Sequence, residues 1–451
     1  MTEMDNVEMQ EQLRKIRKAC DLGPLTLQNM QDYWVDTASA RDPMQHVRAQ
    51  IKQELEHDSH RHILLYGHRG CGKSTELNQL ENELGDDFPM VRINIQEELN
   101  PYDATAVKIV FIIAAKLAEF AEEKNLELDE TALTQVYDFV QTVTTTTETS
   151  GRDAAAEVGA GIDTEASLLG KVVGLFVKGK ANIKYASSSE TERVTKLHER
   201  PGDLIATANT LIGSIRNAQP KIVVVVENID KMDMDRFRTI FFENPSVLTA
   251  LEINTIFTIP VFAVYSPDAN RLKANFDLLV SMPMIKPTHP DGTAFEPGRS
   301  ILKEIIARRI SKNFFDDNLA DQLVDASGGV IRLIIEVIRI CVSVTDAKLP
   351  ITKDTLNYAI KRKQSDFARQ IVPPRDAPEG LDTTALYDRL EQLAKQQSKG
   401  KKIQAAGDTI DQILLQSEAL CEYNGARWFG VHPLVRNILV DLGRAERNDD
   451  I

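Results

Sequence analysis

The residues best suited to chemistry lie between positions 67 and 75. Residues 67–74 read Gly-His-Arg-Gly-Cys-Gly-Lys-Ser and fit the pattern G-x-x-x-x-G-K-[ST]. Glycines let successive backbone N–H groups turn inward around a phosphate, while the lysine can bridge β- and γ-phosphate oxygens and the serine can bind Mg²⁺. Lys73 is therefore a candidate catalytic group and Ser74 a metal ligand. We expect an ATP and Mg²⁺ site formed by Gly67, His68, Arg69, Gly70, Cys71, Gly72, Lys73, Ser74 and Thr75.

This chemistry also needs a carboxylate close to the metal ion. Residues 223–226 are four consecutive valines, which is typical of a buried strand, and Glu227 follows them directly. Glu227 would then lie at the carboxyl edge of the sheet and bind Mg²⁺ directly or through water. The next position, where an acid often polarises the attacking water, is Asn228, whose amide cannot accept a proton. We expect hydrolysis to be slow or to depend on Asp230, the nearest replacement.

Further groups could respond to the γ-phosphate. Gly328 and Gly329 form a turn ahead of a helical segment, and Arg332 at its beginning could reach the phosphate; a routine surface salt bridge is the alternative. A polar residue at the end of the strand between the two phosphate-site strands could also sense it. Ser266 fits that place, or Thr258 if the strand stops at Pro260. Arginines that could complete a neighbouring subunit's site are Arg236, Arg238 and Arg271, among which the sequence does not choose.

The elements that must position these groups alternate between strands and helices. Apolar runs predict strands at 63–66, 89–95, 221–226, 254–266 and 279–285. Helical patterns separate them, so we expect an α/β fold whose mainly parallel sheet is covered by helices on both faces. The predicted domains are an N-terminal helical segment at 1–60, a P-loop core at 61–290, a helical lid at 298–370 and a C-terminal domain at 380–451.

Two segments of the predicted core have open interpretations. The aromatic and charged residues at 33–37 precede the loop and could cover a nucleotide base, or they could form a surface turn with a packing tryptophan. Residues 142–189 are rich in Thr, Gly, Ala and Ser, and residues 166–189 carry four lysines and no acid. This insertion is interpreted as a flexible surface loop, with contact to nucleic acid or an acidic partner as the alternative.

Bulk composition limits the class of protein. The chain has 451 residues, a formal net charge of −14 and 42% hydrophobic residues, which is typical of a globular protein with two or three domains. The negative charge weakens the case for a general nucleic-acid coat. No apolar run is long enough to span a membrane, and the polar, acidic N-terminus argues against a secretory signal. Four separated cysteines predict reduced thiols in a cytoplasmic protein.

The C-terminal domain is predicted to be a winged helix. Two helical segments precede a hairpin with arms at 419–423 and 427–431 and the turn Asn424-Gly425, a strong hairpin signal. Residues 371–451 carry ten basic and thirteen acidic side chains. Because a DNA-reading wing should be basic, we expect this domain to contact protein.

Together these motifs resemble those of AAA+ and STAND-like P-loop ATPases, especially the initiator-like bacterial branch. The resemblance rests on the phosphate loop, Glu227 with Asp230, the glycine turn leading to Arg332, and the C-terminal segment around Val431-His432-Pro433. It implies that the base lies between the N-terminal segment and the lid, and that ATP binding with slow hydrolysis controls homo-oligomer assembly or a protein partner. The alternatives are a nucleotide-gated scaffold or sensor of a bacterial defence system, and a DNA-binding initiator or transposition-type loader.

Overall fold

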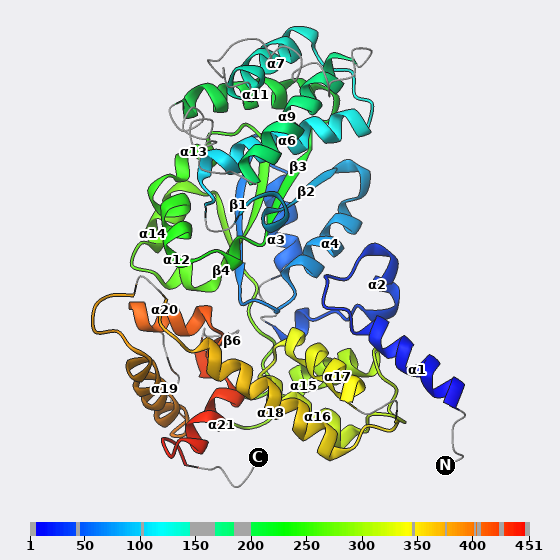
Figure 1. Ribbon diagram of the computed structural model, residues 1–451, viewed down its shortest axis with the longest axis vertical. Coiled ribbons are helices and arrows are strands. Elements are labelled where there is room, and N and C mark those ends of the chain that lie inside the picture. Colours follow the sequence, from blue (N-terminus) through cyan, green and yellow to red (C-terminus); the bar gives the residue numbers. More distant parts are fainter. Residues whose placement is uncertain are drawn as a thin grey trace, which may run out of the picture.

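A five-stranded parallel sheet lies at the centre of the molecule (Figure 1). The computed structural model describes residues 6–41, 46–100, 103–144, 167–184, 200–344, 348–374, 377–400, 403, 407–423 and 428–446. The strand order is β2-β3-β4-β1-β5 and every pair is parallel. The strands are β1 (His62–Gly67), β2 (Met90–Asn94), β3 (Val223–Glu227), β4 (Asn254–Pro260) and β5 (Leu278–Ser281).

The sheet matches the expected α/β fold, and two of its strands are shorter than the apolar runs that predicted them. All residues of β1 and β3 are buried, as expected of strands covered on both faces. The apolar run that begins at Asn254 continues to residue 266 with Pro260 inside it, and β4 ends at that proline, as one of the alternatives allowed. Residues 261–265 instead form a 3₁₀ turn. Proline lacks the backbone N–H that would continue the hydrogen-bond ladder, so the strand ends at this residue. Strand β5 ends at Ser281, whereas its apolar run continues to residue 285.

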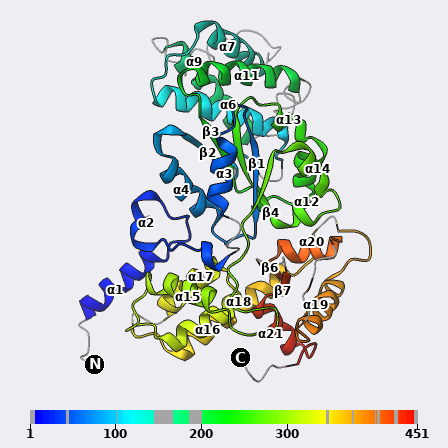
Figure 2. The ribbon, with the colours of Figure 1, turned by 180° about the vertical axis from the view of Figure 1, so that it is seen from behind.

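Helices cover both faces of the sheet, and further helices lie beyond one of its ends (Figures 1 and 2). Those near the phosphate loop are α3 (Val47–Leu55), α4 (Lys73–Leu84) and α5 (Ile95–Glu98), and those beside β3 and β4 are α12 (Met234–Phe237), α13 (Pro245–Thr249) and α14 (Ala269–Asn275). Among the described residues, no helix is both long and apolar enough to cross a membrane.

A cluster of four helices occupies the end of the molecule opposite the lid (Figure 1). It consists of α6 (Ala106–Glu123), α7 (Glu130–Thr144), α9 (Leu168–Lys184) and α11 (Pro201–Ala218). The presence of α9 corrects the expectation of a loop throughout residues 142–189. Phe176 of α9 packs edge-on against Phe111 of α6, with ring centroids 5.2 Å apart. Lys180 also pairs with Glu119 at 2.5 Å, so this lysine is used within the molecule; residues 145–166 and 185–189 of the insertion lie outside the described residues.

A helical lid follows the sheet in the chain. It comprises α15 (Glu296–Ala307), α16 (Asp317–Ser327), α17 (Ile331–Val344) and α18 (Lys353–Gln370). The N-terminal helices α1 (Asn6–Ala19) and α2 (Leu27–Tyr33) lie on the side of the lid and of α4 (Figure 1).

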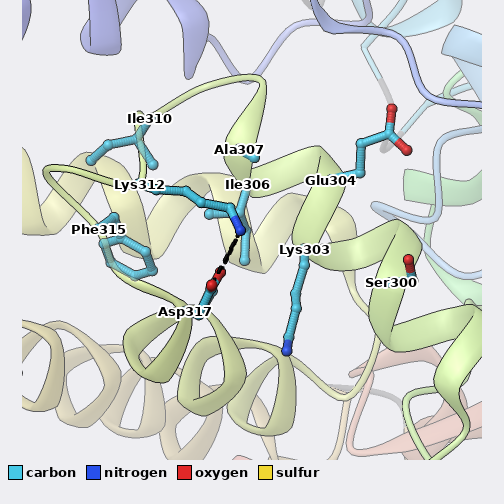
Figure 3. A pocket seen from close by; sticks show the side chains of 10 residues that line it. Ser300, Lys303, Glu304, Ile306, Ala307, Ile310, Lys312, Phe315 and Asp317 are labelled. Carbon is cyan, nitrogen blue, oxygen red and sulfur yellow. Dashed lines mark hydrogen bonds and ion pairs between the residues drawn. The ribbon is translucent and has the colours of Figure 1, made fainter.

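The lid has a cavity of about 270 Å³ between the end of α15 and the beginning of α16 (Figure 3). Its apolar lining includes Ile306, Ile310 and Phe315. Lys312 pairs with Asp317 at 2.9 Å, and Lys303 in the same lining pairs with an aspartate of α16 at 2.6 Å. Both lysines are therefore engaged in ion pairs within the lid.

The C-terminal region contains the predicted hairpin. Its elements are α19 (Thr383–Gln397), α20 (Thr409–Gln416), β6 (Leu420–Tyr423), β7 (Trp428–Val431) and α21 (Pro433–Asp441). Strands β6 and β7 pair antiparallel, while the predicted turn at Asn424 and Gly425 lies outside the described residues. Both strands are fully buried, because they pack between the core and the lid rather than projecting into solvent.

Candidate nucleotide-binding site

The phosphate loop joins β1 to α4 and has the backbone that a phosphate cradle requires. Gly70 and Gly72 have φ angles of 77° and 104°, in the left-handed region that glycine tolerates. Gly67 has no room for a side chain, because a Cβ would lie 2.4 Å from the Met282 carbonyl oxygen. The beginning of α4 at Lys73 adds the N–H groups of a helix N-terminus, which favour an anion.

Lys73 is held inside the loop by two backbone carbonyl groups and one carboxylate. Its ammonium lies 2.9 Å from the Gly67 carbonyl oxygen, 3.0 Å from that of His68 and 2.8 Å from a carboxylate oxygen of Asp230. Burial alone would lower the pKa of Lys73, but the Asp230 carboxylate outweighs it and raises the pKa. The lysine is therefore a fully charged, positioned counter-ion for a phosphate. Asp230 lies on the 3₁₀ turn that follows β3, so the structure brings these two predicted residues together.

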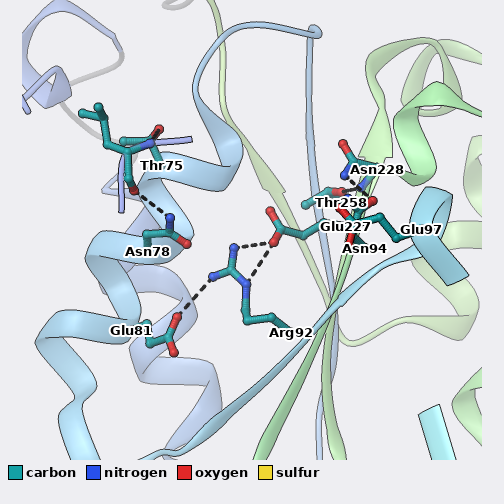
Figure 4. A network of polar contacts seen from close by, with 10 residues as sticks. Thr75, Asn78, Glu81, Arg92, Asn94, Glu97, Glu227, Asn228 and Thr258 are labelled. Atoms are coloured by element: carbon teal, nitrogen blue, oxygen red, sulfur yellow. Dashed lines mark hydrogen bonds and ion pairs between the residues drawn. The ribbon is translucent and has the colours of Figure 1, made fainter. Parts of the chain in front are cut away.

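Glu227 ends β3 and is bound on one side only (Figure 4). One carboxylate oxygen accepts hydrogen bonds from Arg92 of β2, with the Arg92 Nε at 2.9 Å, and Arg92 also reaches Glu81 of α4. The other oxygen, Oε1, is buried and has no partner among the described residues. A buried carboxylate oxygen without a donor suits a cation or its bound water. The residues present thus fit Mg²⁺, with Glu227 and Ser74 as the groups that would hold it.

The strand ends beside Glu227 are linked by amide hydrogen bonds (Figure 4). Asn228 has a left-handed φ of 65°, and its side-chain amide donates to the Asn94 side chain at 2.6 Å. Its backbone N–H donates to the Thr258 hydroxyl at 3.1 Å. Thr258 is therefore the polar residue of β4 that lies at the site.

Ser266 does not occupy the predicted strand end. Because β4 ends at Pro260, Ser266 follows the 3₁₀ turn, and its hydroxyl accepts a hydrogen bond from the Asp268 N–H at 3.2 Å, next to α14. The sequence-based assignment of Ser266 is corrected in favour of Thr258, the alternative that depended on Pro260.

The lid touches the loop directly through Arg332. The Arg332 backbone N–H donates to the Gly70 carbonyl oxygen at 3.3 Å, and a Cβ at Gly70 would lie only 2.7 Å from the Arg332 Cβ. Its guanidinium pairs with Glu336, one turn further along α17, at 3.0 Å. The predicted residue is therefore at the phosphate loop, and its guanidinium charge is paired with the Glu336 carboxylate.

A small cavity beside the loop lies between the N-terminal segment and the lid. Its volume is about 80 Å³, and its lining includes Tyr33, Trp34, Arg41, Gly72 and Ile331. The buried Arg41 side chain donates to the Cys71 carbonyl oxygen at 2.5 Å, which fixes this segment to the loop. A partly aromatic cavity beside a phosphate cradle is suited to a nucleotide base. The aromatic segment at 33–37 thus lies where the resemblance places a base.

The N-terminal segment is also fixed to the helix that follows the loop (Figure 4). The Leu25 N–H donates to the Thr75 hydroxyl at 3.2 Å, and its carbonyl oxygen accepts from the Asn78 side chain at 2.7 Å. Thr75, predicted as a cofactor-binding residue, therefore has a structural partner in this arrangement.

The C-terminal region reaches the same site, which the sequence analysis did not anticipate. The Glu422 backbone N–H donates to the His68 Nε2 at 2.7 Å, and burial lowers the pKa of His68 to about 3, so its ring is a neutral acceptor. On the lid side, the Tyr423 hydroxyl donates to the Gly328 carbonyl oxygen at 2.9 Å. No local pattern signals these contacts, because they join residues up to 354 positions apart.

The candidate arginines for a neighbouring site lie around α12 and α14. Arg238 and Arg271 each approach Asp268 at 3.6 Å, and both side chains are substantially exposed. Arg236 lies on α12 itself. Their assignment to a neighbouring subunit stays a prediction.

Comparison with known proteins finds a family match for the region that contains the phosphate loop. Residues 49–259 match the model of the KAP family P-loop domain. A search of curated proteins finds no significant match. Similar solved structures include a Walker-type ATPase of Pyrococcus abyssi, with 13% identity, a TM-score of 0.43 and coverage of 94% of this chain and 99% of that chain.

Two further solved structures align over most of the chain. The ORC2 protein of Aeropyrum pernix, in ADPNP–ADP complexes, has 10% identity, a TM-score of 0.40 and coverage of 95% and 99%. The RuvB Holliday junction branch migration motor of Thermotoga maritima has 13% identity, a TM-score of 0.34 and coverage of 94% and 99%. Likeness at this level carries no argument about function. Residues 49–259 are therefore similar to the KAP family P-loop domain, and the geometry of the loop agrees with that likeness.

Proposed function

We propose that the chain is an ATPase that binds ATP with Mg²⁺ and uses binding and slow hydrolysis to control self-assembly or a protein partner. The observation that carries the proposal is the convergence of Lys73, Glu227 and Asp230 at the carboxyl edge of the sheet, where one oxygen of Glu227 has no donor among the described residues. These are the positive counter-charge, the metal ligand and the additional acid that phosphoryl transfer needs. Bound Mg²⁺ would neutralise phosphate charge and orient the leaving group.

The groups of the chain divide the remaining work. Lys73 would exchange its bond to Asp230 for the β- and γ-phosphates, which frees the Asp230 carboxylate to accept a proton from the attacking water. Asn228 cannot do so, and its amide is already engaged by Asn94. Thr258 and Arg332 would contact the γ-phosphate from the strand and lid sides. Because the base must first lose its lysine partner, we propose that turnover is slow.

The C-terminal region would respond to the bound nucleotide. We propose that it is a winged-helix-like module of the initiator-like type, which contacts protein. Its two strands are buried against the core and lid, so the described part of the hairpin is used for intramolecular packing. A nucleotide-gated switch is favoured over a fast motor by the same feature, because contacts from β6 reach both the loop and the lid.

Equilibrium titration with a fluorescent ATP analogue and Mg²⁺ tests the site. Wild-type protein should bind, and Lys73→Ala should lose binding because the ammonium is the main counter-charge for the γ-phosphate. Lys273→Ala, which removes an exposed lysine of α14, is the matched control and should bind normally. Equal affinity of the Lys73→Ala and wild-type proteins would sink the assignment.

A further inference from the structure

The C-terminal region supplies an acidic side chain to the nucleotide site. Glu418 lies between α20, which ends at Gln416, and β6, which begins at Leu420. Its φ of 60° is in the left-handed region, where a residue after a helix is usually glycine. A glutamate held in this backbone state indicates a constrained position, and strained positions are frequent at functional sites.

The chain on both sides of Glu418 is bound to the site. The Gln416 side chain donates to the Met232 carbonyl oxygen at 3.3 Å, two residues after Asp230. On the other side, the Glu422 N–H donates to His68 of the phosphate loop at 2.7 Å. These two bonds fix Glu418 between the turn after β3 and the phosphate loop.

The charges that face Glu418 are those that a terminal phosphate would meet. Arg69 and Lys73 of the loop region and Arg332 of the lid attract it, while Glu336 of α17 repels it. Burial is the largest influence and raises the pKa of Glu418 to about 7, despite the three cations. The Cys421 thiol of β6 also interacts with Glu418, and burial keeps that thiol protonated.

We propose that Glu418 discriminates against the γ-phosphate, so that the site accepts a nucleoside diphosphate more readily than a triphosphate while the C-terminal region is docked. A carboxylate and a γ-phosphate carry like charge and compete for Lys73 and Arg332. A diphosphate lacks the competing group. The inference rests on the proposed ATP-binding function and assigns a specificity-determining residue within it.

Affinities for Mg-ATP and Mg-ADP, measured by calorimetry on the full chain, test the proposal. Glu418→Gln keeps the size of the side chain and removes its charge, so it should raise the ratio of ATP to ADP affinity by about tenfold, which corresponds to one modest charge interaction. Glu418→Gly removes the carboxylate and suits the left-handed backbone, and it should show the same change. It keeps the test valid if the glutamine variant folds poorly.

Glu391→Gln is the matched control. Glu391 is another carboxylate of the C-terminal region, and it pairs with Lys395 and Arg444 instead of facing the loop. The affinity ratio of this variant should equal that of wild type. An unchanged ratio of ATP to ADP affinity in both Glu418 variants would overturn the proposal. If ATP hydrolysis were lost as well, Glu418 would instead act in the chemical step. Absence of any nucleotide binding in wild type would instead remove the proposed function, and this inference with it.

Proton uptake gives a readout that a structural role would not change. An arriving γ-phosphate adds negative charge beside Glu418, so it should raise the pKa of this carboxyl further and draw a proton from solution near pH 7.5. Calorimetry in buffers of different ionisation enthalpy should show more uptake for ATP than for ADP in wild type. The difference should shrink in Glu418→Gln; equal uptake in the two proteins would contradict the proposal.

Discussion

The two acids that follow the valine strand have different partners, and this decides what each can do. Glu227 shares Arg92 with Glu81 and keeps one oxygen free, whereas Asp230 forms a buried pair with Lys73. Buried ion pairs are costly to break on one side, because the remaining charge has no compensation. The lysine and the candidate base are therefore held in one interaction, which a bound phosphate would have to replace.

The Lys73–Asp230 pair predicts a specific pattern of stability. Lys73→Ala should lower the free energy of unfolding by about 3 kcal/mol, since Asp230 would remain buried and unpaired. The double variant Lys73→Ala/Asp230→Ala should recover much of that loss while still failing to bind ATP. Urea unfolding of the single and double variants measures this. Additive losses in the double variant would show that the two side chains are not energetically coupled.

Glu418 predicts a pH dependence of stability. Its pKa is about 7 in the folded chain, above the ordinary glutamate value of 4.5, so between these pH values the folded state binds a proton that the unfolded state does not. This contribution is fully present below pH 4.5 and is lost as pH rises through 7. Glu418→Gln should therefore gain stability over wild type by about 1–3 kcal/mol more at pH 8 than at pH 5. Urea unfolding at the two pH values tests it, and a constant difference would argue against the shifted carboxyl.

At the scale of elements, glycine turns set how the lid meets the core. Gly329 has a φ of 87°, and a Cβ there would lie 1.7 Å from the Ile285 carbonyl oxygen. The beginning of α17 can therefore approach β5 and the phosphate loop only because this position lacks a side chain. The same turn receives the C-terminal region, since the Tyr423 hydroxyl bonds to the Gly328 carbonyl oxygen.

This close approach predicts a contrast between two glycines of equal backbone angle. Gly380 also has a φ of 87°, but no atom lies within 4 Å of a Cβ built there. Gly380→Ala should cost about 1–2 kcal/mol, the left-handed penalty alone. Gly329→Ala should cost several kcal/mol, because a backbone carbonyl must also move. Thermal or urea unfolding compares them; similar losses would mean that the lid can shift without penalty.

Local sequence signals predicted the helices and strands better than they predicted the contacts between distant elements. The phosphate loop, the parallel strands, the lid helices and the arms of the hairpin follow from short patterns, since periodicity and turn chemistry act over a few residues. The end of β4 stayed open in the sequence because its apolar run continues past Pro260 into a buried 3₁₀ turn. Helix α9 was missed because its glycines and threonine-rich surroundings resemble a loop, although it packs against both α6 and α7.

The same contrast between local patterns and long-range contacts holds for the candidate site. Lys73, Glu227 and Asp230 could be assigned from spacing, because a P-loop and the end of a neighbouring strand must meet. The partners of these residues could not be, since Arg92 lies on another strand and Glu418 comes from the far end of the chain. Long-range packing, which brings these groups together, leaves no mark in local composition.

At the scale of the whole molecule, the nucleotide site is a meeting point of all parts except the four-helix cluster (Figure 1). The N-terminal segment supplies Arg41, the core supplies the loop and acids, the lid supplies Arg332, and the C-terminal region contacts His68. A change in bound phosphate would therefore alter contacts to three other parts at once. Such an arrangement suits a switch whose output is the position of the lid and the C-terminal region.

Slow turnover is the expected kinetic signature of this arrangement. Asn228 offers no base and Asp230 must first release Lys73, so isolated protein should hydrolyse ATP below roughly 1 per second, the low end of typical enzymes. Phosphate release under saturating Mg-ATP measures it. Turnover well above that value without any partner would count against both the switch and the role given to Asp230.

The lid residue Arg332 links the bound phosphate to assembly. Without ligand its guanidinium pairs with Glu336, and its backbone contacts the phosphate loop. If it turns to the γ-phosphate, ATP but not ADP should hold the lid closed and favour self-association. The charge-assisted bond should contribute about 1.5–3 kcal/mol to the preference for ATP over ADP in the closed state.

Arg332→Ala should therefore still bind ADP but lose ATP-driven assembly, as followed by sedimentation or light scattering. Arg339→Ala is the matched control, because it removes an exposed arginine from the same helix, α17, and should assemble as wild type does. Opposite behaviour of the two variants would separate contact with the phosphate from a general loss of positive charge on the lid. If Arg332→Ala assembles with ATP as readily as wild type, the guanidinium serves only its bond to Glu336, and the signal to the lid must pass through Gly70 or the C-terminal contacts instead.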